Sequence, residues 1–362
     1  MKLKNCGETL TDRGRAHIVG LGLIGSSIAL ALSKGGWRVT GWDSDARVNA
    51  EAEALGIQIE GVNTDAELTF VCVPAGAVAN TVREISTHLS SQDAIITDVA
   101  GVKAAIVRSI SDPRFIGGHP MAGSELRGPR SADSEMFRGA NWILTPSEGT
   151  TPTHYSRLHT ILRELGATVV AVDPDQHDRL MAIASHVPHL VAGALMNEAT
   201  DSSQYDAVLL QLAAGGFRDM TRIAAGDPAI WPDVLFENRD AVKDTLNSLI
   251  SRMQTLLSAI ETSDRSELER LLQKAAEARR ALPGRAVESE SLAYLRIELS
   301  DEPGQLARVA VTASDMLVNI FDIEISHSAS EAFGTLLLAV DSRDVQRFIE
   351  SLVSDGFMVG QT

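Results

Sequence analysis

The sequence lacks several features that mark secreted, membrane-spanning or metal-binding proteins. Its 362 residues include two cysteines, Cys6 and Cys72, which are too few for a disulfide framework or a cysteine-based metal site. No apolar run approaches the roughly 20 residues of a membrane helix. Residues 1–15 form a polar leader without the apolar core of a signal peptide. We therefore expect a cytoplasmic protein without a metal site.

An excess of basic residues is also missing. The formal net charge is −16, whereas nucleic acids and anionic membrane surfaces both require a positively charged footprint. These two classes of partner are therefore excluded. An anionic metabolite remains compatible with the sequence, provided that its pocket is locally basic.

The first organised stretch is a strand, a glycine-rich turn and a helix. The strand at 17–19 leads into Gly20-Leu21-Gly22-Leu23-Ile24-Gly25, and a helical pattern follows. In this context the glycines allow a tight turn and the close approach of a pyrophosphate, which meets the helix N-terminus. The segment predicts a dinucleotide-binding site.

A carboxylate at the end of the next strand favours NAD over NADP. Asp43 lies about 20 residues after the glycine turn, where such a residue can bind both adenosine ribose hydroxyls and repel a 2′-phosphate. Arg47 is near enough to tolerate a 2′-phosphate. The strictness of the NAD preference therefore stays open.

Strands and helices alternate through residue 173. Further strands are expected at 68–73, 94–97, 114–117, 141–145 and 168–172. This alternation predicts an α/β domain over 16–173 with a Rossmann-type, doubly wound parallel sheet. Because ligands bind at the carboxyl ends of parallel strands, Pro74, Asp98 and His119 are expected to border one crevice.

His119 is the candidate proton acceptor. It lies between glycines and before Pro120, directly after an apolar run, and this pattern predicts a turn. Imidazole suits proton transfer near neutral pH. Alone, the segment is more typical of an ordinary loop histidine; the dinucleotide fingerprint favours the catalytic interpretation.

Residues 174–282 have helical periodicity throughout and predict an all-helical domain. Long apolar helices are commonly shared between subunits, so we expect a homodimer formed through this domain. Pro188 is expected to break the helix between His186 and His189, two histidines that need partners or a ligand. Arg222 is a candidate carboxylate clamp, with an ion pair to Asp219 or Asp227 as the alternative.

The C-terminal part reads as a separate small module. Residues 283–291 form a polar linker, and residues 292–362 show a β-α-β-β-α pattern, which predicts a small α+β, ferredoxin-like domain. Nothing in it suggests catalysis. Packing between subunits and ligand sensing are both compatible with the pattern.

Together these segments resemble the bacterial prephenate dehydrogenase family with a C-terminal ACT domain, over residues 16–359. The resemblance rests on five segments: Gly20–Gly25, Gly118–Glu125, Ser185–His189, Gly215–Arg222 and Asp227–Trp231. It implies NAD-dependent oxidative decarboxylation of prephenate to 4-hydroxyphenylpyruvate in tyrosine biosynthesis.

The resemblance also implies residue roles. His119 matches the histidine that accepts the 4-hydroxyl proton, and Arg222 matches the arginine that binds the ring carboxylate. The other matched catalytic and substrate-binding positions are Ser124, Ser185, His189, Asp219 and Trp231. One departure is Gly101, which stands where the family usually has a serine that orients the histidine.

The C-terminal module resembles ACT domains at two segments. These are Asp301-Glu302-Pro303-Gly304 and Val318-Asn319-Ile320, which match segments that bind amino acids. The resemblance implies tyrosine as a feedback effector. A purely structural module is the alternative.

Two other functions remain open. The same enzyme class acts on arogenate, which carries an amine in place of the side-chain ketone, and an acidic residue such as Glu125 or Glu237 near the pocket would favour it. A non-catalytic NAD-linked amino-acid sensor would account for Gly101. It would leave His119 and Arg222 unexplained.

Overall fold

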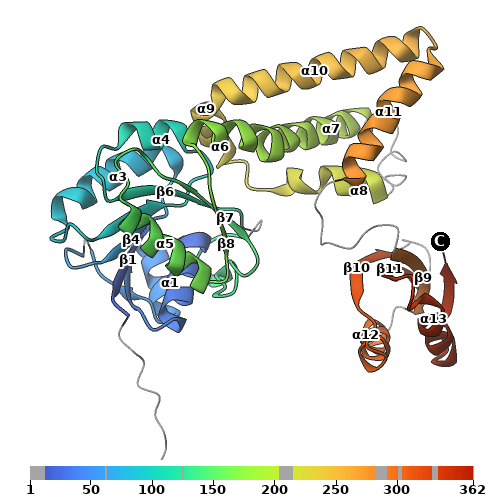
Figure 1. Ribbon diagram of the computed structural model, residues 1–362, viewed down its shortest axis with the longest axis horizontal. Coiled ribbons are helices and arrows are strands. Elements are labelled where there is room, and N and C mark those ends of the chain that lie inside the picture. The colour runs from blue at the N-terminus through green and yellow to red at the C-terminus, as the bar shows by residue number, and fades with distance from the viewer. Residues whose placement is uncertain are drawn as a thin grey trace, which may run out of the picture. The chain divides into compact units, whose positions relative to one another are not determined.

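The computed structural model describes residues 13–61, 63–123, 126–203, 215–281, 292–300, 304–327 and 333–361. It divides into two compact units, residues 1–251 and 252–362 (Figure 1). The division falls inside the predicted helical domain, because the first helices of that domain pack against the sheet domain, with α6 on α4 and α9 on α3.

An eight-stranded sheet forms the centre of the first unit, with strand order β3-β2-β1-β4-β5-β6-β7-β8. The strands are β1 Arg15–Val19, β2 Arg38–Trp42, β3 Gln58–Ile59, β4 Leu68–Val71, β5 Ile95–Asp98, β6 Phe115–Pro120, β7 Asn141–Thr145 and β8 Thr168–Ala171. All neighbouring pairs are parallel except β6 and β7. The predicted Rossmann-type sheet is confirmed, with one antiparallel pair that the strand pattern did not indicate.

Helices cover both faces of this sheet. They are α1 Leu23–Lys34, α2 Ala46–Ala54, α3 Ala75–His88, α4 Ala104–Ser109 and α5 Pro152–Glu164. One hydrophobic cluster lies under α1 and α5, and a second lies under α3 and α4. Every residue of β4 and β5 is buried, which explains why apolar residues make up most of these strands; the others are Thr69, Thr97 and Asp98.

The helical region begins with a single long helix (Figure 1). Helix α6 Pro174–Met181 passes through a π-helical turn, Ala182–His186, into α7 Val187–Ser203. The predicted break at Pro188 is wrong. The N–H group of Val187 bonds to the carbonyl of Ala182, five residues back, so the proline follows a widened turn that tolerates its missing N–H group.

By length and composition alone, this helix would be able to cross a membrane. Residues Pro174–Ser202 include a window of mean hydropathy 1.3, of which 28% is buried. The individual apolar runs are short, and only the π-helical turn joins them into one helix. Such a helix is weak evidence for a membrane span, because core helices of soluble proteins pass the same test.

The remaining elements of the helical region are short helices followed by two long ones. They are α8 Gly215–Thr221, a 3-10 turn Arg222–Ala225, α9 Trp231–Glu237, α10 Arg239–Glu261 and α11 Arg265–Arg280. Helix α10 crosses the division between the units.

The C-terminal module is an antiparallel sheet with two helices. Its elements are β9 Leu292–Ser300, α12 Gln305–Asp315, β10 Ile320–His327, β11 Phe333–Asp341, α13 Val345–Ser354 and β12 Met358–Gln361. The strand order is β10-β11-β9-β12. The predicted α+β module is confirmed, and β12 adds a strand that completes the ferredoxin-like pattern. Side chains of β9 alternate between buried and exposed, and the buried ones share a core with α12 and α13.

Candidate active site

The glycine turn has a different physical requirement at each glycine. Gly20 has a φ of +93°, and a Cβ on Gly25 would lie 1.9 Å from the Gly20 carbonyl oxygen. Gly20 is thus needed for its backbone conformation and Gly25 for the close packing of α1 on the turn. A Cβ on Gly22 would meet no described atom within 4 Å. The N-terminus of α1 is therefore open to a pyrophosphate.

Asp43 is held beside this turn by backbone amides. The N–H group of Leu21 donates to Oδ2 of Asp43 at 2.8 Å, and that of Asp45 donates to Oδ1 at 2.9 Å. The carboxylate is thereby oriented where the adenosine ribose would lie. Arg47 donates to both carboxylate oxygens of Asp45, at 3.2 and 2.8 Å, so its charge is already paired.

A cleft of about 890 Å³ extends from the glycine turn to the helical region. Its lining includes Gly22–Gly25 from the sheet domain and Ser185, His189, Arg222 and Trp231 from the helical region. Segments far apart in the sequence therefore meet at one cleft. His119 does not line the cleft, although Ala122 and Gly123 from the same β6 connection do.

His119 lies on β6, where it pairs with Ile143 of β7. The predicted turn at this histidine is wrong, because the antiparallel partner strand keeps the chain extended as far as Pro120. The histidine is half-buried, and the flanking Gly118 is fully packed: a Cβ there would lie 2.7 Å from the carbonyl oxygen of Asp98.

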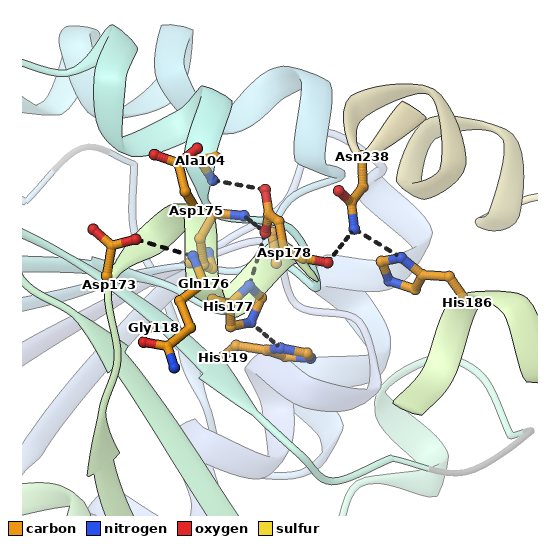
Figure 2. Close-up of polar contacts among 12 residues, drawn as sticks. Ala104, Gly118, His119, Asp173, Asp175, Gln176, His177, Asp178, His186 and Asn238 are labelled. Atoms are coloured by element: carbon orange, nitrogen blue, oxygen red, sulfur yellow. Dashed lines mark hydrogen bonds and ion pairs between the residues drawn. The ribbon is translucent and has the colours of Figure 1, made fainter. Parts of the chain in front are cut away.

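His119 is the first member of a chain of hydrogen bonds (Figure 2). Its Nδ1 lies 2.9 Å from Nε2 of His177, and Nδ1 of His177 lies 2.8 Å from Oδ1 of Asp178. Asp178 also accepts from the backbone amides of Lys103 and Ala104, at 2.8 and 2.9 Å. The two residues of α6 thus connect the histidine to the start of α4.

This chain determines which nitrogen of His119 carries a proton. Hydrogen bonds lower the pKa of Asp178 below its usual value despite the opposing effect of burial, so its carboxylate is ionised and can only accept. His177 then donates from Nδ1 and accepts at Nε2, and His119 donates from Nδ1. The Nε2 atom of His119 is left as a proton acceptor.

The electrostatics keep His119 neutral. Burial lowers its pKa well below the usual value, and the nearby His177, Lys103 and His186 lower it further. A neutral imidazole at pH 7 is the protonation state that a general base requires.

Asp98 is completely buried, with Lys103 as its ion-pair partner. Its Oδ1 accepts from the N–H group of Gly118 and its Oδ2 from that of Ala100, each at 3.0 Å. Asp98 is not among the described residues that line the cleft, and its carboxylate is occupied by these internal contacts. Its assignment as a cofactor-binding residue therefore stays a prediction. Its role is to tie the β5–α4 loop, which contains Gly101, to the strand that carries His119.

Gly101 faces the accepting nitrogen of His119. A Cβ on this glycine would lie 3.7 Å from Nε2 and 3.8 Å from Cε1 of His119, without a clash. The glycine that stands in place of the usual serine therefore lies on the side of the imidazole from which a proton would arrive.

Two further histidines have distinct partners. The side-chain amide of Asn238 donates to Nδ1 of His186 at 3.1 Å and to the carbonyl of Asp178 at 2.7 Å, and burial lowers the pKa of His186 to about 4. His189 stacks on Trp231, with ring centroids 3.6 Å apart and planes 14° apart. His186 is thus structural, and His189 belongs to an aromatic wall of the cleft.

Arg222 is exposed at the cleft and has no ion-pair partner among the described residues. Asp227, one of its two alternative partners, pairs with Arg127 instead. The other, Asp219, is exposed on α8 and does not line the cleft. The guanidinium of Arg222 is therefore available to a carboxylate.

Pro74 and Glu237 are not among the described residues that line this cleft. Pro74 is exposed at the N-terminus of α3, and Glu237 is exposed at the end of α9. Ser124, Glu125, Asp301 and Pro303 lie outside the described residues. In the C-terminal module, Gly304 has a φ of +93° before α12, Asn319 is exposed and Ile320 begins β10.

Sequence reasoning missed His177 and Asp178. The start of α6 was visible as Asp173-Pro174, and Asp173 does cap this helix by accepting from the Gln176 amide at 3.0 Å. No spacing rule connects a helix in one domain with a strand residue 58 positions away. The chain of hydrogen bonds from His119 to Asp178 could be identified only from the fold.

Comparisons with known proteins agree with this architecture. The prephenate dehydrogenase nucleotide-binding domain matches residues 28–171, and the prephenate dehydrogenase dimerization domain matches residues 173–274. The prephenate dehydrogenase of Bacillus subtilis (strain 168) is 30% identical over 351 residues, which cover 93% of this chain and 94% of that protein.

Two solved structures are similar to this chain over about three quarters of its length. The prephenate dehydrogenase from A. aeolicus, in complex with hydroxyphenyl propionate and NAD+, has a TM-score of 0.69 and 28% identity over 74% of this chain and 97% of that chain. The Synechocystis arogenate dehydrogenase has a TM-score of 0.63 and 32% identity over 73% and 98%. With both domain models and a relative matched over nearly its whole length, the chain belongs to the prephenate dehydrogenase family.

Proposed function

We propose that the protein catalyses the NAD-dependent oxidative decarboxylation of prephenate to 4-hydroxyphenylpyruvate. The observation that carries the proposal is the His119–His177–Asp178 chain, which leaves Nε2 of a neutral His119 as a proton acceptor. This hydrogen-bond chain lies in the same unit as the cleft. The lining of the cleft includes the open glycine turn and Arg222, which has no ion-pair partner among the described residues.

The residues of the cleft fit the cofactor. The open approach at Gly22 suits a pyrophosphate at the N-terminus of α1, and the oriented carboxylate of Asp43 suits a ribose diol. When bound, NAD accepts a hydride from the substrate carbon that carries the hydroxyl group. The oriented carboxylate of Asp43 would also repel a 2′-phosphate, which supports NAD over NADP.

His119 accepts the hydroxyl proton as the hydride leaves, and a carbonyl forms at that carbon. Positive charge on the imidazole is stabilised through His177 by the Asp178 carboxylate. The bond between the ring and its carboxylate then breaks, carbon dioxide leaves, and the electron pair enters the ring, which becomes aromatic. The phenol oxygen takes a proton back from His119.

Arg222 holds the ring carboxylate until it leaves. A guanidinium binds a carboxylate through two parallel hydrogen bonds, and this one has no competing partner among the described residues. His189 and Trp231 form the flat wall on which the substrate ring would lie, and Ser185 contributes a hydroxyl at the same lining.

The test is the formation of NADH by the purified protein with NAD and prephenate. Arogenate in place of prephenate, and NADP in place of NAD, are the two comparisons. We expect the highest kcat/KM with prephenate and NAD. No turnover with prephenate would refute the proposal, and a higher kcat/KM with arogenate would reassign the substrate, in line with the Synechocystis relative. A non-catalytic sensor would leave the His119 chain without a role.

We further propose that the protein is a homodimer regulated by tyrosine. The match to a dimerization domain supports a homodimer formed through the helical region, and exposed apolar side chains such as Leu180 and Ile183 fit a subunit contact. The ferredoxin-like module is proposed to be an ACT domain that binds tyrosine. Sedimentation tests the first statement, and inhibition by tyrosine tests the second.

A further inference from the structure

The described lining of the cleft has three charged side chains: Arg127, Arg222 and Asp227. Arg222 has no ion-pair partner among the described residues, whereas Arg127 and Asp227 form an ion pair with each other. The side chain of Arg127 is 66% exposed and that of Asp227 is 18% exposed. The cleft therefore presents one free guanidinium and one that is already bound to a carboxylate.

The ion pair joins the two walls of the cleft. Arg127 belongs to the β6–β7 connection, which continues into a 3-10 turn at Pro129–Ser131 in contact with α1 and α2. The neighbouring Arg130 forms an ion pair with Glu51 at 3.0 Å, but its side chain is 80% exposed, so this pair contributes little to the anchoring. Asp227 belongs to the helical region. The backbone of Arg127 is thus anchored on the dinucleotide side, while its guanidinium reaches the opposite wall.

Asp227 places that guanidinium at the substrate end of the cleft. It directly follows Gly226, on which a Cβ would lie 3.7 Å from Cε1 of His189 and 3.9 Å from Nε1 of Trp231. The same segment begins at Arg222. Arg127 therefore reaches the stretch that carries the proposed clamp and borders the proposed aromatic wall.

The proposed substrate carries two carboxylates, one on the ring and one on the side chain. Arg222 can hold one of them, and Arg127 is the other cation of the described lining. A guanidinium has five N–H donors, so a contact with Asp227 leaves donors for a second carboxylate. We propose that Arg127 binds the side-chain carboxylate of the substrate, and that its pairing with Asp227 selects a keto acid over the corresponding amino acid.

The selection follows from the charge on Asp227. An amino acid side chain carries an ammonium group beside its carboxylate, and an unpaired Asp227 would attract it. Pairing with Arg127 neutralises the one carboxylate of the described lining, and a neighbouring guanidinium repels an ammonium group. A keto acid has no ammonium group, so it neither needs an unpaired Asp227 nor is repelled by the guanidinium of Arg127. The inference rests on the proposed function and adds the group that distinguishes its two substrates.

The experiment compares three variants by steady-state kinetics with prephenate and arogenate. Arg127→Gln removes the cation and frees Asp227, so we expect the KM for prephenate to rise about tenfold or more, and the kcat/KM ratio of arogenate to prephenate to rise. Asp227→Asn frees the guanidinium while keeping an acceptor for the Ala229 amide, which now donates to Oδ1 at 2.9 Å. Because Asp227 also positions the guanidinium, we expect the prephenate KM to rise less than in Arg127→Gln. The arogenate-to-prephenate ratio should fall, because no carboxylate remains there to attract the ammonium group.

Arg130→Gln is the matched control. It removes an arginine from the same connection, but its partner Glu51 lies outside the cleft lining, so both KM values should stay unchanged. Melting temperatures identify any variant that fails to fold. Calorimetric titration with NAD, in the absence of substrate, measures whether Arg127 contributes to cofactor binding instead.

Two outcomes would overturn the inference. One is an Arg127→Gln variant with an unaltered prephenate KM and substrate ratio. The other is a weakened NAD Kd with an unaltered prephenate KM, which would assign Arg127 to the pyrophosphate. Failure of the proposed function is distinguishable, because the wild-type protein itself would then oxidise neither prephenate nor arogenate.

Discussion

His119 and His177 share one hydrogen bond, with Nδ1 of the first 2.9 Å from Nε2 of the second. The two rings meet edge to face, with centroids 5.1 Å apart. Because His177 is fully buried and bound to Asp178, it has one available orientation and one available tautomer. The state of the strand histidine is therefore set by a helix from the other domain.

Replacing His119 removes the proposed proton acceptor. His119→Asn should lower kcat by about 10² or more, the scale of a lost general base, with a small change in the KM for prephenate. Steady-state kinetics at saturating NAD is the measurement. An unaltered kcat would show that His119 is not the base.

His177 is a positioning residue, so replacing it should lower kcat less than replacing His119 does, and it should change the pH–rate profile. His177→Asn keeps a polar side chain but breaks the link to Asp178, and kcat should fall about tenfold, because the tautomer of His119 is no longer fixed. His88→Asn, on the exposed end of α3, is the control. A pH–rate profile with the wild-type shape would argue that His177 only packs.

A hydroxyl group at Gly101 should be accommodated and should assist His119. A Cβ there lies 3.7 Å from Nε2, so a serine hydroxyl would come within hydrogen-bonding reach of the substrate proton or of the imidazole. We expect Gly101→Ser to raise kcat severalfold and Gly101→Ala, which adds only the methyl group, to leave it unchanged. Equal rates for the two variants would count against this role of a hydroxyl.

The pH–rate profile should show a base that stays neutral in mild acid. Because the pKa of His119 lies well below the usual 6.5, kcat should remain level as the pH falls through 6.5 and should decrease only at lower pH. A single loss of activity centred near pH 6.5 would mean that the imidazole is not shielded in the working enzyme.

The stability of the fold should fall in mild acid because of His17. This buried residue of β1 bonds Thr40 through Nδ1 at 2.8 Å, and burial lowers its pKa to about 4. The unfolded chain, with a pKa near 6.5, binds the proton more readily, so stability is lost as the pH falls from 6.5 toward 4. Between pH 7 and 5 this loss should be about 2 kcal/mol.

Urea unfolding at the two pH values measures this effect. His17→Asn, which cannot titrate, should start from a lower stability at pH 7 and lose less on acidification. An equal loss in the variant and the wild type would assign the acid sensitivity to other groups, such as His186.

Much of the fold could be predicted because it depends on local patterns. Predominantly apolar strands such as β4 and β5 indicate a sheet buried on both faces, and the glycine turn has the same local requirements in any protein of this fold. The antiparallel pairing of β6 with β7 could not be predicted, because pairing direction leaves no mark on hydrophobic periodicity.

The site was predictable where motifs are contiguous and not where partners come from separate elements. His119, His189 and Arg222 stood out beside glycines and prolines. The burial of Asp98 could not be predicted, since a carboxylate at the end of a strand can equally well bind a ligand or pair with a buried lysine. The link from His119 to Asp178 depends on how α6 docks against the sheet, which no single segment contains.

The π-helical turn at Ala182–His186 has a consequence for how this chain tolerates changes in length. Each residue advances a helix by about 100°, so deleting one residue from the turn would swing His189 and the rest of α7 around the axis while His177 stayed in place. His177, in the first part of this helix, orients His119, whereas His189, after the turn, lines the cleft. The rotation between these two histidines about the helix axis depends on the one extra residue of the π-helical turn. Insertions and deletions between α6 and α7 should therefore be absent from functional variants of this chain.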